Sequence, residues 1–477
     1  MRFYITTTLP YVNADLHVGQ ALEFIRADII ARYKKMSGFE VFFNTGTDEH
    51  GIKIHEKAKS VGKSTQEFVD ERFLRFKEYV KMFGMMDGIH FIRTTDASHE
   101  KAACEFWNRV YKSGYIYKKN YQAKYCIGCE SEKTDRELVN GHCPDHPGIM
   151  LEIINEENYF FKFSEFQKPL LDFYSKNPNF VVPDFRFNET KAFVERGLED
   201  FSVSRLKSKM PWGIEIPCDT EHVMYVWFDA LTNYISTLGW PEDDENSQFY
   251  KFWINGTPTQ YCGKDNNRFQ SAIWQAMLMA VGIKNSSQII INGHITADGG
   301  MKMSKTLGNI VDLEKVIEEY STEALRFFLA KEIGFEDSPF GMERFKDSYN
   351  ASLANGLGNL TSRVMKMAET NLSSPVLLKP ADFPEDFTEL MNSFDIKKAS
   401  DLIWHEISVC DAYIQETKPF TLIKTDEAKA CGIITELVAR LHKIAFMLYP
   451  ILPQTSDKIM ELIKTNKSPV EPLFLRK

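Results

Sequence analysis

The spacing of apolar side chains near the N-terminus predicts a strand, a helix and a second strand in succession. Residues 3–7 alternate aromatic, β-branched and hydroxyl side chains, which is typical of a short strand, and Pro10 ends it. An apolar stripe at helical spacing follows and stops before Gly38, and residues 40–45 again have a strand pattern. This unit predicts a parallel sheet with a ligand site at the carboxyl ends of its strands. The stripe consists of Leu22, Ile25, Ile29, Tyr33 and Met36.

The α/β pattern is interrupted once and then replaced by a helical one. Strand patterns return at 222–227 and 288–292, with a helix pattern at 270–280 between them, and they vanish after about Phe345. A loop with three prolines at 371–385 separates two of the later helices. We therefore expect an α/β fold in which residues 1–113 and 218–345 form the two halves of a Rossmann-like parallel sheet. Residues 114–217, which are rich in Tyr, Phe, Asn and Lys, form an insertion, and 346–477 form an all-α bundle.

Composition places the chain among soluble globular proteins. Of its 477 residues 43% are apolar and 26% are charged, with a formal net charge of −9. No window reaches 18 consecutive apolar residues, and the N-terminus turns polar too early for a signal peptide, so we expect a cytoplasmic protein without a membrane span. The acidic total excludes a protein that coats nucleic acid through a broad cationic surface, but a local contact stays open.

Two loops carry residues suited to a nucleotide. His17 and Gly19 stand at the start of the first predicted helix, where free backbone N–H groups and the helix dipole favour an anion. Lys302 and Lys305 lie between glycines in a second loop, from which ammonium groups can reach a leaving pyrophosphate. Taken singly, the first loop also fits an ordinary helix start and the second a solvated surface loop.

A cysteine cluster in the insertion predicts a metal site. Cys126 and Cys129 are separated by two residues, as are Cys143 and His146, and thirteen residues stand between the pairs. This spacing is typical of a tetrahedral Cys3His zinc site, which we expect to be structural because all four positions are filled by protein. His142 is a competing imidazole next to Cys143. A disulfide reading does not suit a cytosolic chain.

Together these segments resemble the class I aminoacyl-tRNA synthetases, and among them the methionyl-tRNA synthetase family. The two loops resemble the HIGH and KMSKS motifs of that class, and the likeness extends over essentially the whole chain. Further matching segments lie at 9–13, 46–51, 225–230 and 263–265. The resemblance implies that the chain activates methionine with ATP and Mg²⁺ to methionyl adenylate and transfers the methionyl group to the 3′ end of tRNA(Met).

The resemblance also implies roles for individual residues. It assigns His17, Gln20, Lys302 and Lys305 to catalysis, and Gly19, Asp265 and Lys305 to ATP. It assigns Leu9, Tyr11, Asp48, Trp227, Ala230, Tyr234 and Gln270 to the amino acid, with Asp48 binding its ammonium group. It assigns Asn359, Arg363 and Phe420 to the tRNA anticodon, with the Phe420 ring stacking on a base.

The chain departs from the family pattern at several of these positions. Gln20 and Gln270 stand where the family has histidines, Asn266 stands where it usually has an apolar residue, and Phe420 replaces a tryptophan. A more polar pocket favours a different amino acid unless its polar groups are paired, and for Gln270 we expect a hydrogen bond to Tyr234 that replaces the one from histidine.

Charge and length bear on the partners. Residues 346–477 hold 16 basic and 17 acidic side chains, so the bundle is nearly neutral and does not repel RNA strongly. Little chain follows the bundle, so we expect no further C-terminal dimerisation domain and a monomer. Two alternatives to a methionine-specific ligase stay open: a paralogue that activates another amino acid, and a non-catalytic tRNA-binding protein that kept the fold.

Overall fold

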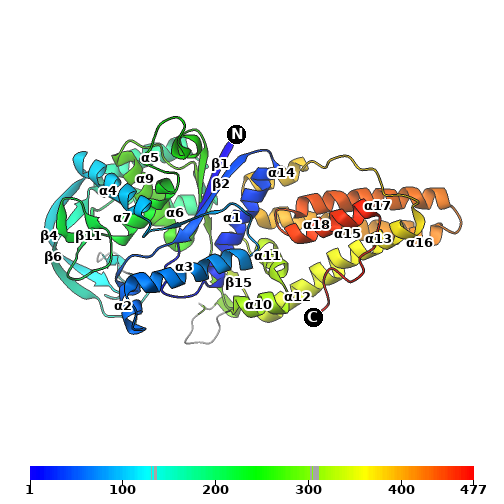
Figure 1. Ribbon diagram of the computed structural model, residues 1–477, viewed down its shortest axis with the longest axis horizontal. Coiled ribbons are helices and arrows are strands. Elements are labelled where there is room, and N and C mark those ends of the chain that lie inside the picture. Colours follow the sequence, from blue (N-terminus) through cyan, green and yellow to red (C-terminus); the bar gives the residue numbers. More distant parts are fainter. Residues whose placement is uncertain (130, 134–136, 301–302, 304–310) are drawn as a thin grey trace.

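The computed structural model describes residues 1–477 apart from 130, 134–136, 301–302 and 304–310. The molecule is elongated, with an α/β body at one end and a bundle of long helices at the other (Figure 1). This confirms the predicted succession of an α/β region and a helical one.

A six-stranded parallel sheet forms the centre of the body, in the order β3-β2-β1-β12-β13-β7. The strands predicted at 3–7, 40–45 and 288–292 are confirmed as β1, β2 and β13. The edge strand β7 comes from the stretch predicted as an insertion and pairs in parallel with β13. The six strands are β1 (Arg2–Thr7), β2 (Glu40–Thr47), β3 (His90–Arg93), β7 (Val181–Val182), β12 (Thr257–Gly263) and β13 (Gln288–Asn292).

Alternation along the strands divides the body into two cores. Phe3 and Ile5 of β1 pack on one face of the sheet, whereas Tyr4 packs on the other. The first face is covered by α1 (Val18–Met36), α3 (Thr65–Met82) and α11 (Thr322–Lys331), and the second by α4 (Ala97–Lys112) and α9 (Trp274–Ala280). Strand order reverses between β1 and β12, so the loops that follow these two strands border the crevice where α/β sheets bind ligands.

Two antiparallel sheets flank the body, and one of them changes a sequence prediction. The strand expected at 222–227 ends earlier, as β11 (Asp219–Met224), and pairs with β9 and β10 instead of joining the parallel sheet. Helix α7 (Val226–Leu231) begins directly after it, so Trp227 lies on a helix. Short apolar runs fit either element, and here the hydrogen bonds that Asp229 accepts from two histidines favour the helical turn. The sheet strands are β4 (Ile116–Cys126), β5 (Ser131–Lys133), β6 (Glu152–Phe161), β8 (Phe201–Ser202), β9 (Ser204–Leu206) and β10 (Glu215–Ile216).

The bundle follows the predicted apolar period. Leu353, Leu357, Leu360 and Val364 are fully buried. The predicted proline-containing loop is confirmed, because α13 (Asn359–Asn371) ends and α14 (Glu385–Asn392) begins at its two ends. The remaining bundle elements are α12 (Met342–Ser348), η8 (Tyr349–Gly358), α15 (Ile396–Thr417), α16 (Pro419–Leu422), α17 (Glu427–Leu448) and α18 (Pro453–Thr465).

Shorter elements complete the body. Among the described residues no helix has the length and apolar character needed to cross a membrane. These elements are α2 (Ile52–Ser60), η2 (Phe163–Phe166), α5 (Gln167–Lys176), α6 (Asp184–Glu195), α8 (Asn233–Ser236), η3 (Phe249–Ile254), η4 (Lys264–Asn266), η5 (Phe269–Ile273), β14 (Ile295–Thr296), η6 (Asp298–Gly300), α10 (Leu313–Glu319) and β15 (Ser338–Pro339).

Candidate functional site

The start of helix α1 is closed by a reciprocal cap between His17 and Gln20. The N–H of Gly19 donates to Nδ1 of His17 at 3.1 Å, and the backbone N–H of His17 donates to Oε1 of Gln20 at 3.0 Å. A Cβ on Gly19 would lie 3.0 Å from Cε1 of His17, so a small residue is needed for the imidazole to reach this position. Gln20 therefore orients the helix start through its side-chain oxygen.

His17 carries its proton on Nε2. The side chain is exposed, but desolvation by neighbouring groups and the nearby His294 lower its pKa, and together they outweigh the opposing field of Asp265. The ring is therefore neutral at pH 7, and because Nδ1 accepts from Gly19, the proton resides on Nε2. This N–H is a donor suited to a phosphate oxygen.

Asp265 and His294 face each other across the ends of two neighbouring strands. Asp265 follows β12 and His294 follows β13, and their Oδ1 and Nε2 atoms lie 3.9 Å apart. The Asp265 side chain is 69% exposed; desolvation by its neighbours would raise its pKa, but the interaction with His294 and the nearby His17 lower it. Asp265 is therefore a carboxylate at neutral pH, able to accept from ligand hydroxyl groups.

A buried acid lies beneath this crevice. Oε1 of Glu23 accepts from the backbone N–H and the hydroxyl of Thr8, directly after β1. Complete burial raises the pKa of Glu23 to about 8, although the hydrogen bonds from Thr8 oppose the shift. Glu23 is therefore protonated and neutral at pH 7, and the crevice gains no second negative charge from it.

Asp48 is placed at the carboxyl end of β2, opposite the loop that follows β1. Its backbone N–H donates to the carbonyl oxygen of Pro10 at 3.1 Å, and a β-bridge joins it to Tyr11. Asp48 is 5% exposed, and Leu9 and Tyr11 are half-buried beside it. The structure therefore brings together three of the residues predicted to bind the amino acid.

The other predicted pocket residues come from α7, α8 and η5. The ring of Trp227 stacks on Phe269 with centroids 3.9 Å apart and an interplanar angle of 11°. The predicted bond between Gln270 and Tyr234 is confirmed, since Nε2 of Gln270 donates to the phenolic oxygen. Ala230, Tyr234 and Gln270 are all buried.

A buried His–Asp–His cluster attaches α7 to the rest of the site. Nδ1 of His50 lies 2.7 Å from one carboxylate oxygen of Asp229, and Nε2 of His99 lies 2.7 Å from the other. His99 also contacts the hydroxyl of Ser236 at 2.8 Å. Asp229 is two residues from Trp227 and His50 is two residues from Asp48. The cluster therefore joins the two segments that carry these predicted pocket residues.

The four predicted metal ligands converge. One donor atom from each of Cys126, Cys129, Cys143 and His146 lies within 4.8 Å of the others. The Sγ atoms of Cys129 and Cys143 are 3.5 Å apart, and Nδ1 of His146 lies 3.8 Å from Sγ of Cys126. Ligand–ligand edges of about 3.3–3.8 Å are expected for tetrahedral zinc with bonds of about 2.0–2.3 Å, so the donor set fits Zn²⁺. The competing His142 is absent from this group of described residues.

Residues 126–146, which carry the four predicted metal ligands and are called the knuckle below, are attached to both sides of the crevice. Lys53, near the start of α2, donates to the carbonyl oxygen of Gly128 at 2.7 Å, and Arg268 pairs with Glu137 at 2.6 Å. Arg268 immediately precedes Phe269, which stacks on Trp227. The knuckle thus contacts the segments that follow both Asp48 and Asp265.

The predicted anticodon residues lie on one side of the bundle. Arg363 and Phe420 line a pocket of about 450 Å³ together with Met367 and Ile414. The Phe420 ring is 51% exposed, and Arg363 is held by an ion pair of 2.7 Å to Asp411. Asn359 is exposed one turn before Arg363 on α13 and does not line the pocket. An exposed ring beside a fixed guanidinium suits an unpaired nucleobase.

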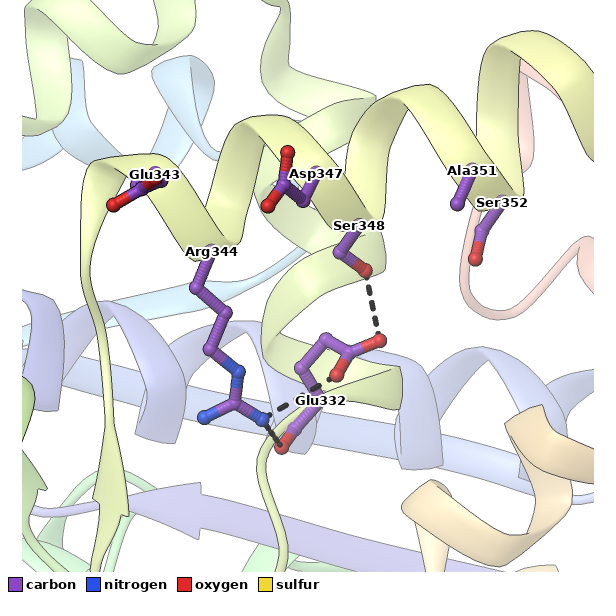
Figure 2. A pocket seen from close by; sticks show the side chains of 7 residues that line it. All are labelled: Glu332, Glu343, Arg344, Asp347, Ser348, Ala351 and Ser352. Atoms are coloured by element: carbon purple, nitrogen blue, oxygen red, sulfur yellow. Dashed lines mark hydrogen bonds and ion pairs between the residues drawn. The ribbon is translucent and has the colours of Figure 1, made fainter.

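A larger cavity of about 580 Å³ lies away from the crevice, between α11 and α12 (Figure 2). The carboxylate of Glu332, which lines this cavity, is already hydrogen-bonded within the protein. Glu332 accepts from Ser348 at 2.8 Å and from Arg344 at 3.4 Å, as the dashed lines in Figure 2 show. None of the predicted site residues lines it.

Some of the chemistry lies beyond the predicted residues. The predicted Lys302 and Lys305 lie outside the described residues. Sequence reasoning missed His294, Glu23 and the cluster around Asp229. His294 follows the carboxyl end of a predicted parallel strand, and that position was the available signal. The bonds of His50 and His99 to Asp229 left no local pattern, because Asp229 lies 179 and 130 positions away from them.

Comparisons with known proteins point to the same family over nearly the whole chain. A family model described as "tRNA synthetases class I (M)" matches residues 3–150 and 147–365, and one described as "Anticodon binding domain of methionyl tRNA ligase" matches 380–471. Methionine–tRNA ligase of Thermotoga maritima is 38% identical, covering 98% of this chain and 76% of that protein. The Clostridium perfringens enzyme is also 38% identical, covering 99% and 74%. A solved structure of Mycobacterium tuberculosis methionyl-tRNA synthetase with methionyl-adenylate has a TM-score of 0.88 at 33% identity, covering 97% of this chain and 94% of that one.

Proposed function

Because this chain belongs to the methionyl-tRNA synthetase family of class I aminoacyl-tRNA synthetases, we propose that it joins methionine to tRNA(Met) at the expense of ATP. The observation that carries the proposal is the placement of His17 at the start of α1, Asp265 directly after β12 and Asp48 directly after β2, on the side of the sheet where its parallel strands end. Each of these residues offers the hydrogen-bonding capacity that one part of methionyl adenylate needs.

In the first step the carboxylate of methionine attacks the α-phosphorus of ATP, and pyrophosphate leaves. Nε2–H of His17 donates to a phosphate oxygen, Asp265 accepts from the ribose hydroxyls, and Asp48 holds the ammonium group of methionine. No side chain forms a covalent intermediate, so the rate comes from alignment and from donors that match the charge of the transition state. The resemblance assigns Lys302 and Lys305, which lie outside the described residues, to the leaving pyrophosphate, and Mg²⁺ bound with ATP would offset its negative charge.

In the second step the ribose hydroxyl at the 3′ end of tRNA attacks the carbonyl carbon of the adenylate, and AMP leaves. Residues 1–113 and 218–345 act as the catalytic halves, and 346–477 read the anticodon. A base stacked on Phe420 with Arg363 at its edge gives the recognition a local contact, which is compatible with the acidic total charge. The enzyme acts as a cytoplasmic monomer.

Cys126, Cys129, Cys143 and His146 of the knuckle would hold one structural Zn²⁺. Three thiolates and one imidazole would supply all four ligands that such a site needs, which suits a structural metal and not one that activates water. Its part in the reaction is mechanical, because Lys53 and Arg268 connect it to both walls of the crevice.

The test is a charging assay with radiolabelled methionine and total tRNA. We expect acid-precipitable methionine to accumulate and to be released by mild base, as an ester at the tRNA 3′ end must be. The variant His17→Asn is expected to lose most of the rate, because its shorter side chain does not reach the same oxygen. Absence of charging by the wild-type protein, with exchange of pyrophosphate intact, would instead favour an adenylate-forming enzyme with another acceptor.

A further inference from the structure

A chain of buried amides runs from a backbone N–H to the phenol of Tyr234. The backbone N–H of Ser286 donates to Oε1 of Gln275 at 3.1 Å, and Nε2 of Gln275 donates to the Ser286 hydroxyl at 3.1 Å. That hydroxyl donates to Oε1 of Gln260, Nε2 of Gln260 donates to Oε1 of Gln270 at 2.6 Å, and Nε2 of Gln270 donates to Tyr234.

The direction of the first bonds in this chain is fixed at their origin. A backbone N–H can only donate, so the atom of Gln275 facing Ser286 must be its oxygen, and the amide nitrogen must face the hydroxyl. Asn285 reinforces this orientation by donating to the same oxygen at 3.1 Å. Gln260 keeps its oxygen toward Ser286, because the opposite orientation would leave the buried Ser286 proton without this acceptor. All side chains of the chain are at most 3% exposed, so water does not substitute for a partner.

The orientation of the Gln270 amide determines how the Tyr234 hydroxyl can hydrogen-bond. Its oxygen accepts from Gln270, so its own proton is available for another acceptor. Among the described residues, the side chains that hydrogen-bond to this phenol are Gln270 and Gln260, and both donate to its oxygen. Burial holds the pKa of this phenol far above neutral pH, so the proton is present throughout the physiological range.

We propose that Gln260 is a positioning residue that sets amino-acid specificity, because it holds the Gln270 amide so that the Tyr234 hydroxyl can only donate toward the bound side chain. The acceptor is a group with a lone pair, such as the thioether sulfur of methionine, which is a weak acceptor. The inference rests on the proposed function, in which Tyr234 and Gln270 line the methionine pocket. A histidine at position 270 can change tautomer or charge, whereas this amide is locked at both ends and is insensitive to pH.

The test compares methionine with norleucine, in which a CH₂ group replaces the sulfur, by amino-acid-dependent exchange of pyrophosphate into ATP. In Gln260→Leu the amide of Gln270 is free to turn its oxygen toward Tyr234, which then donates to Gln270 instead of to the ligand. We expect kcat/KM for methionine to fall by about tenfold while kcat/KM for norleucine changes by less than about threefold. Gln288→Leu, at the start of β13 and outside the chain, is the matched control and should change neither.

A second variant covers the case in which Gln260→Leu does not fold. Gln260→Glu retains the shape, and its carboxyl group donates to Gln270 only when protonated. We expect the preference for methionine over norleucine to decline with rising pH in this variant and to stay constant in the wild type. Equal losses for both substrates, or a constant preference in Gln260→Glu, would overturn the role of Gln260. If methionine does not support pyrophosphate exchange by the wild-type protein, the proposed function itself is overturned.

Discussion

Nδ1 of His50 lies 2.7 Å from Oδ2 of Asp229 inside the body, where both side chains are almost completely buried. Burial alone would raise the pKa of Asp229, but His50 and His99 lower it to about 2. Burial alone would lower the pKa of His50, but Asp229 raises it. The pair is therefore charged below pH 6.5, and it connects the segments that carry Asp48 and Trp227.

This pair predicts an acid limit to stability. The carboxylate contributes stability above its unfolded pKa of 3.8, and the contribution is lost as pH falls through the folded pKa of about 2. A shift of this size corresponds to about 2 kcal/mol. We expect Asp229→Asn to unfold at a lower temperature than the wild type at pH 6, and the difference in thermal midpoint to shrink toward pH 2. A difference that stays constant across this range would contradict the charged pair.

The imidazole of His50 gives the same pair an alkaline dependence. Its folded pKa lies above the ordinary value of 6.5, so its contribution is complete below that pH and is lost as pH rises through the raised pKa. His50→Gln should therefore differ most from the wild type in thermal midpoint below pH 6.5 and least at high pH.

Glu23 predicts the opposite behaviour for a lone buried acid. Its folded pKa of about 8 exceeds the ordinary 4.5, so the folded state binds an extra proton between these values and loses stability as pH rises through them. Glu23→Gln removes the titration and keeps an oxygen for the backbone N–H of Thr8. Measured by thermal unfolding, the stability of the variant relative to the wild type should increase steadily from pH 5 to pH 8, and then level off. If the thermal midpoints of the variant and the wild type change in parallel with pH, Glu23 is ionised in the folded protein.

The sequence predicted the elements better than the contacts between them. Strand and helix patterns located β1, α1, β2 and the bundle, because each buries one periodic face. The ligands of the knuckle were predicted because two short spacings define them. The strand at 222–227 was wrong in its end and its sheet, since a short apolar run does not distinguish a strand from a helix start. His294 and the Asp229 cluster depend on residues brought together by the fold, which no local pattern records.

The knuckle predicts a strict requirement for glycine at one position. A Cβ on Gly128 would lie 2.5 Å from Cγ of His146, so Gly128→Ala displaces a metal ligand. We expect this variant to retain well under one zinc per chain, measured by native mass spectrometry. Gly148→Ala is the control, because a Cβ there would meet nothing within 4 Å. Full zinc occupancy in Gly128→Ala would show that His146 is not a ligand.

The bundle pocket predicts a separation of the two half-reactions. Arg363→Gln removes the guanidinium beside Phe420, so tRNA charging should fall by about tenfold or more in kcat/KM, as expected for the loss of a charged hydrogen bond. Pyrophosphate exchange should be unchanged, because the adenylate forms in the body. Arg440→Gln, which removes an arginine of α17 that does not line this pocket, should leave both rates near the wild type. Equal charging by both variants would place anticodon recognition elsewhere.

The most direct test of the account is amino-acid-dependent exchange of labelled pyrophosphate into ATP by the wild-type protein, measured for each of the twenty amino acids. The proposed roles of Asp48, which would bind the ammonium group, and of Tyr234, which would donate to the side chain, predict that methionine gives the highest kcat/KM by a wide margin. A higher value for any other amino acid, or exchange with none of them, would contradict it.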